Sequence, residues 1–300
     1  MSSAPTDAPG TPWTGLARAE RFYEDGEIGD LVTRAARYAA AGVPVHLSGA
    51  AGLGKTSVAL RVAERLGRPV AFMAGNAFLT SRDFIGASVG QSTNAVVDRY
   101  VQSVRRTESQ TRPEWRDAIL ARAMERGYTL VYDEFTRASP EANSTLLSVL
   151  EEGVLVSTDQ ANERVYLSAH PDFRIVLTSN PEDYVGVCQA PDAVLDRVVT
   201  LRLSAPTQAT LARIVALRSG IDLQAASRIA ALVRAVAEHG PKGHPPSMRS
   251  AILIARIAAA DIRAGRMTDA LLAEIAGDVL DARGGDRGEL DRLIATARAA

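Results

Sequence analysis

Short apolar runs alternate with stretches of helical periodicity along the first two thirds of the chain. Apolar residues recur at helical spacing at 28–41, 55–66, 113–126 and 140–152. Short runs of apolar and β-branched side chains predict strands at 43–47, 69–73, 129–132, 173–178 and 198–203. Strands separated by helices imply a mostly parallel sheet covered by helices, which is an α/β fold.

Residues typical of helix ends support two of these helices. Pro113 and the pair Ser139-Pro140 suit the first turn of a helix. Gly127 and Gly153 follow the last turns and suit helix stops. We therefore expect helices that begin at Pro113 and Pro140.

Two segments depart from the simple alternation. Residues 154–168 contain two β-prone pieces on either side of a polar turn, which predicts a hairpin. Residues 76–111 are mixed and hydrophilic, and we expect irregular structure there with some helix.

The composition changes at Pro206 and divides the chain. From there on it is rich in Ala, Leu, Ile and Arg, which predicts four or five amphipathic helices with a loop at 240–246. Residues 1–15 are rich in Pro, Ser, Thr and Gly and suggest a flexible arm. We expect an arm at 1–15, an α/β domain at 16–205 and a smaller all-α domain at 206–300.

Charge and composition argue against several classes of protein. The 300 residues include 34 basic and 35 acidic side chains, so no overall basic field indicates nucleic acid. No apolar run reaches membrane-spanning length, and the N-terminus lacks the pattern of a secretion signal. The single cysteine, Cys188, cannot form an internal disulfide. We expect a cytoplasmic protein with neither a membrane nor a nucleic-acid partner.

A glycine-rich segment joins the first predicted strand to the helix at 55–66. It reads Gly49-Ala50-Ala51-Gly52-Leu53-Gly54-Lys55-Thr56, followed by Ser57, and matches the phosphate-loop pattern in full. Its glycines let backbone N–H groups face an anion, and the helix N-terminus adds partial positive charge. Lys55 would reach the outer phosphates and Thr56 would hold Mg²⁺. The segment predicts an ATP-Mg²⁺ site.

Lysine is scarce in this chain, which makes the lysine of the loop informative. Positive charge is almost all arginine, and lysine occurs only at Lys55 and Lys242. Arginine does not replace a compact point charge that must sit against phosphate. Lys55 therefore indicates that the chemistry of the loop requires a lysine. The alternative is that one of the two lysines of the chain lies in the loop by chance.

Polar side chains follow two more predicted strands. Asp133 and Glu134 end the strand at 129–132, where α/β sheets bind ligands. Asp133 would hold the water shell of Mg²⁺, and Glu134 would polarise a water for attack on the γ-phosphate. Asn180 follows the strand at 173–178 and would orient that water, although an Asn-Pro turn explains it equally well.

Two arginines are candidates for contact with the γ-phosphate. Arg197 ends a short predicted helix that begins at Asp192, and Arg249 lies near the start of a helix in the last third. One would act from a neighbouring subunit and the other within its own chain. In so arginine-rich a chain, a surface charge is an open alternative for each.

Together these motifs resemble an AAA+ ATPase of the MoxR type over residues 25–265. Several phrases are most similar to the gas-vesicle branch of the CbbQ/NirQ/NorQ/GvpN family. They are Tyr132-Asp-Glu-Phe-Thr-Arg137, Pro140-Glu-Ala-Asn143, Leu146-Leu-Ser-Val-Leu-Glu-Glu-Gly153, His170-Pro-x-Phe-Arg174 and Thr178-Ser-Asn-Pro-Glu182.

The resemblance implies an AAA+ core followed by a helical lid, with ATP and Mg²⁺ as cofactors. It implies a first sensor, an arginine finger and a second sensor, at Asn180, Arg197 and Arg249 respectively. It also implies a ring, usually a hexamer, because the finger acts across a subunit boundary. Phe84-Ile85-Gly86 falls where some relatives carry a substrate-facing pore loop. The implied clients are gas vesicle structural or accessory proteins, and the resemblance also implies an association with gas vesicles.

Other functions stay open at this point. An activase of the CbbQ or NorQ kind would share the chemistry and act on a metalloenzyme. A nucleotide-binding scaffold without turnover would need neither Glu134 nor Arg197. A DNA motor is disfavoured by the near-zero net charge, and a small-molecule kinase lacks a visible acceptor site.

Overall fold

The computed structural model describes residues 22–24, 26–95, 109–158, 164–180, 192–239, 247–281 and 292. Several expectations lie outside these residues: those for the N-terminal arm at 1–15, the turn at 159–162, Cys188 and the loop at 240–246.

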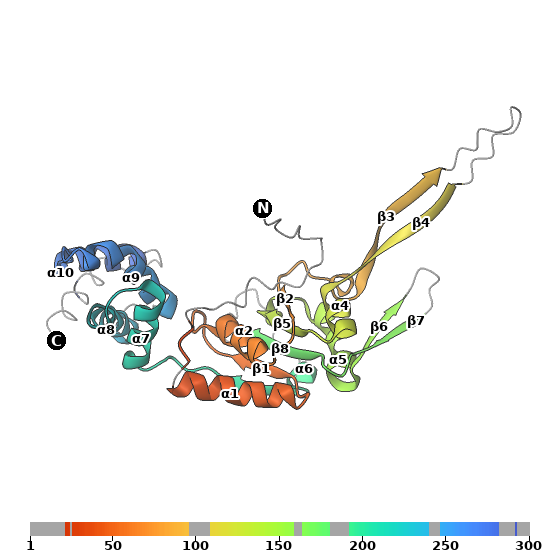
Figure 1. The fold of residues 1–300 in the computed structure, drawn as a ribbon, viewed down its shortest axis with the longest axis horizontal. Helices are drawn as coiled ribbons and strands as arrows, with labels where there is room; N and C mark the ends of the chain where they lie inside the picture. Colours follow the sequence, from red (N-terminus) through yellow and green to blue (C-terminus); the bar gives the residue numbers. More distant parts are fainter. Residues whose placement is uncertain are drawn as a thin grey trace, which may run out of the picture.

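Five parallel strands form the central sheet (Figure 1). Their order is β2-β5-β8-β1-β9, and every neighbouring pair runs parallel. The strands are β1 (Val45–Ser48), β2 (Val70–Ala74), β5 (Thr129–Asp133), β8 (Arg174–Ser179) and β9 (Val199–Arg202). Each lies close to its predicted range, so the predicted α/β class is confirmed.

Helices cover both faces of this sheet. They are α1 (Gly26–Ala40), α2 (Lys55–Arg65), α3 (Ser81–Ile85), α4 (Ile119–Arg126), α5 (Pro140–Glu152) and α6 (Asp192–Leu195). Val131 and Val176 point to one face and share a core with α1 and α2. Leu130 and Leu177 point to the other and share a core with α4 and α5. The alternation of side chains along each strand thus serves two separate cores.

The predicted limits of α5 are confirmed. Ser139 caps the helix, because its side-chain oxygen accepts a hydrogen bond from the backbone N–H of Ala142 at 3.1 Å. Gly153 ends it in the left-handed conformation with φ of 66°. The helix is followed by the predicted hairpin, β6 (Val154–Thr158) paired antiparallel with β7 (Arg164–Ser168).

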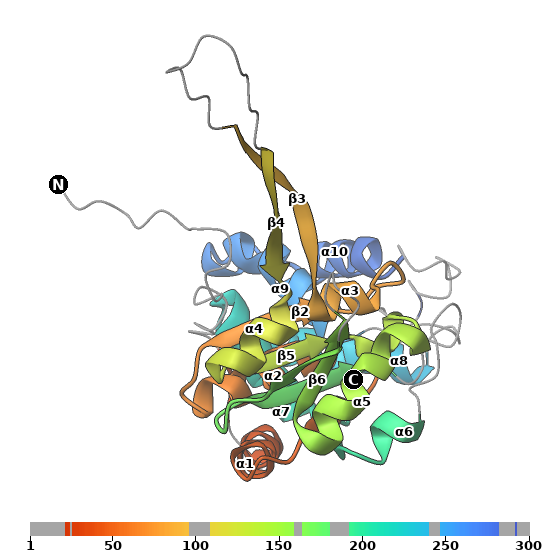
Figure 2. The same cartoon turned by 90° about the vertical axis from the view of Figure 1, so that its right-hand side faces the viewer.

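The prediction of a helix from Pro113 and of irregular structure over 76–111 is wrong in part. The chain forms the short α3 and then a long antiparallel ribbon, β3 (Gly86–Ala95) with β4 (Ser109–Asp117), which projects away from the sheet (Figures 1 and 2). Pro113 pairs with Gln91 in this ribbon, so α4 starts only at Ile119. The sequence of both strands is mostly polar, and without apolar alternation the strand signal is weak.

The last third of the described chain is helical, as predicted. It contains α7 (Gln208–Ser219), α8 (Leu223–His239), α9 (Met248–Arg263) and α10 (Asp269–Asp281). These helices enclose a hydrophobic core of their own, and Figure 1 shows them grouped beside the sheet. The proposed division after residue 205 falls between β9 and α7. Among the residues that the structure describes, no helix is long and apolar enough to cross a membrane.

Candidate functional site

The glycine-rich loop connects the end of β1 to the start of α2. Gly52 and Gly54 have φ values of 79° and 84°, a conformation that side chains disfavour. A Cβ atom on Gly52 would lie 2.5 Å from Cβ of Ser247, and one on Gly54 would lie 2.9 Å from Cε of Met248. Both glycines are therefore needed for the curl of the loop, and Gly52 also for the close approach of Ser247, the residue before α9.

Lys55 begins α2, and its side chain lies within the curl of the loop. It is only 6% exposed, and Nζ donates hydrogen bonds of 2.7 Å to the carbonyl oxygens of Gly49 and Ala50. The ammonium group therefore stays at the loop, where the helix N-terminus also favours negative charge.

Thr56, the next residue of α2, contacts Asp133 at the end of β5. Its hydroxyl lies 2.8 Å from Oδ1 and 2.9 Å from Oδ2 of Asp133. Sequence analysis assigned both residues to one metal ion, and the structure brings them together from positions 77 residues apart. A hydroxyl and a carboxylate are oxygen donors of the kind that Mg²⁺ prefers.

Thr178, on β8, was not identified as a site residue from the sequence. Its hydroxyl donates to Oδ1 of Asp133 at 2.6 Å and accepts from the backbone N–H of Glu134 at 2.9 Å. The residue is fully buried. In the sequence it is only the first residue of the phrase Thr178-Ser-Asn-Pro-Glu182, and a threonine inside an apolar strand is too usual to suggest a role; the pairing of β5 with β8 reveals its position.

Glu134 has a strained backbone. Its φ is 52°, the only positive φ outside glycine in the described parts of the chain. Gly75 permits this bend: its N–H donates to the carbonyl oxygen of Asp133 at 2.7 Å, and a Cβ atom there would lie 2.1 Å from the carbonyl oxygen of Glu134. The carboxylate of Glu134 pairs with Arg137 at 2.8 Å. The bend turns the side chain away from the strand direction at the carboxyl edge of the sheet.

Asn180 and His46 lie at and beside the same edge. Asn180 directly follows β8 and is 8% exposed. His46, on β1, forms hydrogen bonds with Ser179 at 2.8 Å and Thr200 at 3.0 Å, which join three strands. Burial lowers the pKa of His46 to about 4, so its ring is neutral at pH 7.

The two candidate arginines lie in different places. Arg249 is the second residue of α9 and is exposed, next to the residues that contact the loop. Arg197 follows α6 and bonds to Glu151 of α5 at 2.6 Å and to the carbonyl oxygen of Ala193 at 2.7 Å. Its contacts therefore point to the α5–α6 surface and not to the glycine-rich loop of its own chain.

The suggested pore-loop position of Phe84 is wrong. Phe84 is fully buried and packs edge-on against Tyr132, with ring centroids 5.7 Å apart. Its apolar ring completes the core under α3. Phe78, in the preceding connection from β2, is instead 90% exposed.

An apolar cavity of about 90 Å³ opens beside the loop. It lies between the segment before α1, the start of α2 and the helices α7 and α9. Its lining includes Phe22, Tyr23, Leu53, Val58, Ile214 and Met248. Sequence analysis did not predict this cavity, because its walls come from distant parts of the chain and consist of ordinary apolar residues. A phosphate-binding loop beside an apolar cavity is an arrangement that can hold a nucleotide.

Comparisons with known proteins agree with this arrangement. A family model described as "AAA domain (dynein-related subfamily)" matches residues 44–198. The chain is 38% identical to "Gas vesicle ATPase GvpN" of Ancylobacter aquaticus over 89% of this chain and 76% of that protein. It is 25% identical to "Protein CbbQ" of Hydrogenophilus thermoluteolus over 76% of this chain and 77% of that one.

The fold also resembles solved structures. RuvB of Thermotoga maritima superposes with a TM-score of 0.52 at 18% identity, over 87% of this chain and 71% of RuvB. At that identity the likeness shows the fold alone. The family match, the sequence identity along most of the chain and the phosphate loop agree with one another. The chain therefore belongs to the AAA family, within it to the gas vesicle ATPases of the GvpN group, and it is a nucleotide-binding ATPase.

Proposed function

We propose that this ATPase acts in gas vesicle formation, where ATP hydrolysis in a ring of subunits assembles or remodels a structural or accessory vesicle protein. One observation carries the proposal: the 38% identity to a gas vesicle ATPase covers 89% of the chain. It therefore extends beyond residues 44–198, which any ATPase of the family would share. The helical last third belongs to the part that resembles a gas vesicle protein.

The proposed catalytic centre lies where α2 meets the ends of β5 and β8. The loop amides and Lys55 would bind the outer phosphates, which carry the negative charge of the nucleotide. Thr56 and Asp133 would hold Mg²⁺, which usually takes one or two protein oxygens together with phosphate oxygens. The contact between these two side chains supports the assignment.

Glu134 is the proposed general base. Its carboxylate would accept a proton from the water that attacks the γ-phosphate, and Asn180 would orient this water. Arg137 holds the carboxylate at 2.8 Å, so this ion pair must open or shift for Glu134 to act as the base. The arrangement supports hydrolysis over a scaffold without turnover, because a scaffold has no use for a strained acid at this edge.

The apolar cavity is the proposed place of the nucleotide base. It lies next to Gly54 and Ser57, so a base there would leave the phosphates at the loop. Residues of α7 and α9 line it, and Arg249 at the start of α9 would approach the phosphates in cis. A bound nucleotide would thus contact both the sheet region and the helical region.

Arg197 is the proposed finger acting in trans. Its bonds to Glu151 and Ala193 place it on a different surface from the loop of its own chain, as an arginine for a neighbouring site requires. Light scattering with ATP and Mg²⁺ tests the ring. A fully active protein that remains monomeric at working concentration would contradict a finger in trans.

Complementation tests the client. The chain is supplied to a gas vesicle gene cluster that lacks its own vesicle ATPase, and vesicles are scored by flotation and electron microscopy. We expect rescue by the natural sequence and none by Lys55→Ala or Glu134→Gln at equal protein levels. The natural sequence could instead fail to restore vesicles, and a pull-down could recover only a metalloenzyme and its adaptor. These two results together would contradict a role in vesicle formation and favour an activase.

A further inference from the structure

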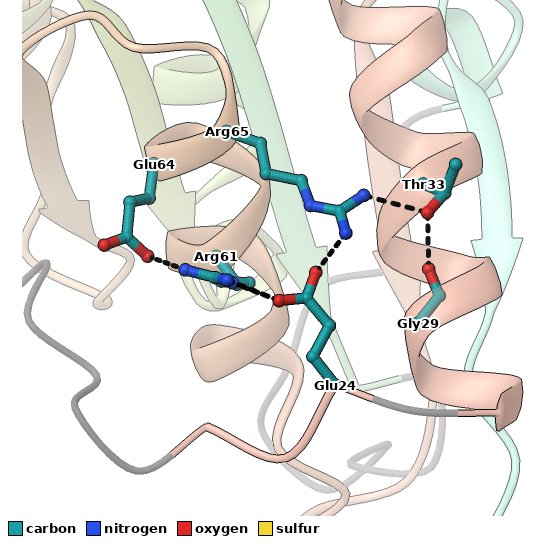
Figure 3. Close-up of polar contacts among 6 residues, drawn as sticks. All are labelled: Glu24, Gly29, Thr33, Arg61, Glu64 and Arg65. Atoms are coloured by element: carbon teal, nitrogen blue, oxygen red, sulfur yellow. Dashed lines mark hydrogen bonds and ion pairs between the residues drawn. The ribbon is translucent and has the colours of Figure 1, made fainter.

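An ion-pair cluster connects the segment before α1 to the helix that carries the phosphate loop (Figure 3). The carboxylate of Glu24 accepts a hydrogen bond of 2.5 Å from Nε of Arg61 and forms an ion pair of 2.6 Å with Arg65. Both arginines belong to α2. The side chain of Glu24 is only 14% exposed, so these contacts are shielded from water more than an ordinary surface pair.

Each arginine also has a second partner that fixes its orientation. Arg61 pairs with Glu64 at 2.6 Å, and Arg65 donates to the hydroxyl of Thr33 at 2.8 Å. Glu24 and Glu64 together raise the pKa of Arg61 above its ordinary value, mainly through their hydrogen bonds. The planar guanidinium groups are thus held in place to receive the carboxylate of Glu24.

The two residues before Glu24 line the apolar cavity. Phe22 and Tyr23 form part of its wall, and the hydroxyl of Tyr23 accepts a hydrogen bond of 3.1 Å from Arg213 of α7. Three consecutive residues therefore contact the cavity, the helical region and α2. Because Arg61 and Arg65 lie on the helix that begins with Lys55, Glu24 fixes this segment relative to the phosphate site.

We propose that Glu24 is a positioning residue for nucleotide binding. Its contacts with Arg61 and Arg65 hold Phe22 and Tyr23 at the cavity beside the phosphate loop, and so set the affinity for the base and sugar of the nucleotide. The inference rests on the proposed function of the cavity as the base site. It goes further because it names the contacts, outside the site itself, that hold two residues of the site's wall in place.

The test compares ADP with inorganic pyrophosphate, which has the two phosphates but no base or sugar. Dissociation constants are measured by calorimetry with Mg²⁺ on the full chain for the natural sequence, Glu24→Gln, Arg65→Gln and the control Glu238→Gln. Glu238 pairs with Arg234 within α8 at 2.8 Å, outside the cluster, so its replacement reports the loss of one ion pair alone.

We expect Glu24→Gln to weaken ADP binding about tenfold, which corresponds to about 1.4 kcal/mol, and pyrophosphate binding by less than about twofold. Arg65→Gln should also weaken the binding of ADP selectively, but by less than Glu24→Gln does, because Arg61 still pairs with Glu24. Glu238→Gln should change the binding of neither ligand by more than about twofold.

Two results would overturn the inference in different ways. If Glu24→Gln and Arg65→Gln weaken both ligands equally, or neither, the cluster only supports the fold. If the natural sequence itself binds ADP no better than pyrophosphate, the cavity is not the base site and the proposed function loses that part. Arg65→Gln keeps the hydrogen bond between Glu24 and Arg61, so this variant still tests the proposal if Glu24→Gln does not fold.

Discussion

The hydroxyl of Thr178 donates a hydrogen bond to Oδ1 of Asp133 at 2.6 Å and accepts one from the backbone N–H of Glu134 at 2.9 Å. A single buried side chain on β8 thus fixes both acids at the end of β5. In the proposed centre, the side chain that would hold the metal and the backbone that would carry the base depend on the same oxygen atom.

Replacement of Thr178 by valine should therefore impair hydrolysis more than binding. Valine has nearly the same shape but lacks the hydroxyl. The N–H of Glu134 is then left unsatisfied at a cost of about 1–3 kcal/mol, and Oδ1 of Asp133 keeps only its contact with Thr56. We expect the rate of phosphate release to fall by about 10²-fold, as for a misplaced catalytic group. Thr178→Ser keeps the hydroxyl and should retain most of the rate. A valine variant as fast as the natural protein would show that the hydroxyl does not position the acids.

Glu134→Gln should separate binding from turnover. Glutamine keeps the length of the side chain but cannot accept the proton, so ATP should still bind while phosphate release falls by at least about 10²-fold. Phosphate release and equilibrium binding are measured on the same preparation. Glu141→Gln, at an exposed acid in the first turn of α5, serves as the control and should behave as the natural sequence. Unchanged release in Glu134→Gln would remove this residue from the proposed role.

Mixing experiments can test Arg197. If the finger acts in trans, Arg197→Ala alone should lose about 10³-fold in rate, because it removes a charge that stabilises the transition state. Rings that mix Arg197→Ala with Glu134→Gln subunits should regain activity, since an intact base in one subunit then meets an intact arginine from its neighbour. Arg256→Ala, at an exposed arginine of α9, is the control. Mixed rings as inactive as their parents would place the arginine in cis or outside catalysis.

Stability should depend on pH through His46. Burial lowers its pKa from 6.5 to about 4 in the folded protein. Below pH 6.5 the unfolded chain binds a proton that the folded chain does not, so this group lowers stability as the pH falls from 6.5 to about 4. The full effect is about 3 kcal/mol.

Urea unfolding between pH 7 and pH 4 measures this dependence. Carboxyl groups titrate in the same range, so the comparison between variants carries the result. His46→Asn should be less stable at pH 7, since it loses the contacts with Ser179 and Thr200, and should show a shallower loss at low pH. His170→Gln, at an exposed histidine, should keep the natural slope. Equal slopes in all three proteins would mean that His46 is not responsible.

The sequence predicted those parts of the site that depend on local patterns. The phrase for the phosphate loop and the pair Asp133-Glu134 at the end of β5 are short motifs, and the structure brings Thr56 and Asp133 into contact. Their catalytic roles stay predictions. Thr178 and Gly75 were given no role from the sequence, because their positions matter only through pairing with β5 and the bend at Glu134.

The wrong predictions also concern features that depend on contacts between distant parts of the chain. The ribbon β3–β4 is a long-range pairing of polar segments, and neither periodicity nor turn residues indicate it. Pro113 suits a helix start, but pairing with Gln91 overrides this preference. Phe84 resembled an exposed aromatic only by its place in the chain, and its burial against Tyr132 follows from the packing of α3.

The contact of Ser247 and Met248 with Gly52 and Gly54 has a mechanical consequence. It seats the N-terminal end of α9, a helix of 16 residues that is therefore about 24 Å long, directly against the phosphate loop. Because α9 shares one hydrophobic core with α7, α8 and α10, a displacement of the loop that pushes on this end has to be taken up by the four helices together. The helical region would then move as one body, with the phosphate loop as the point where the push is applied.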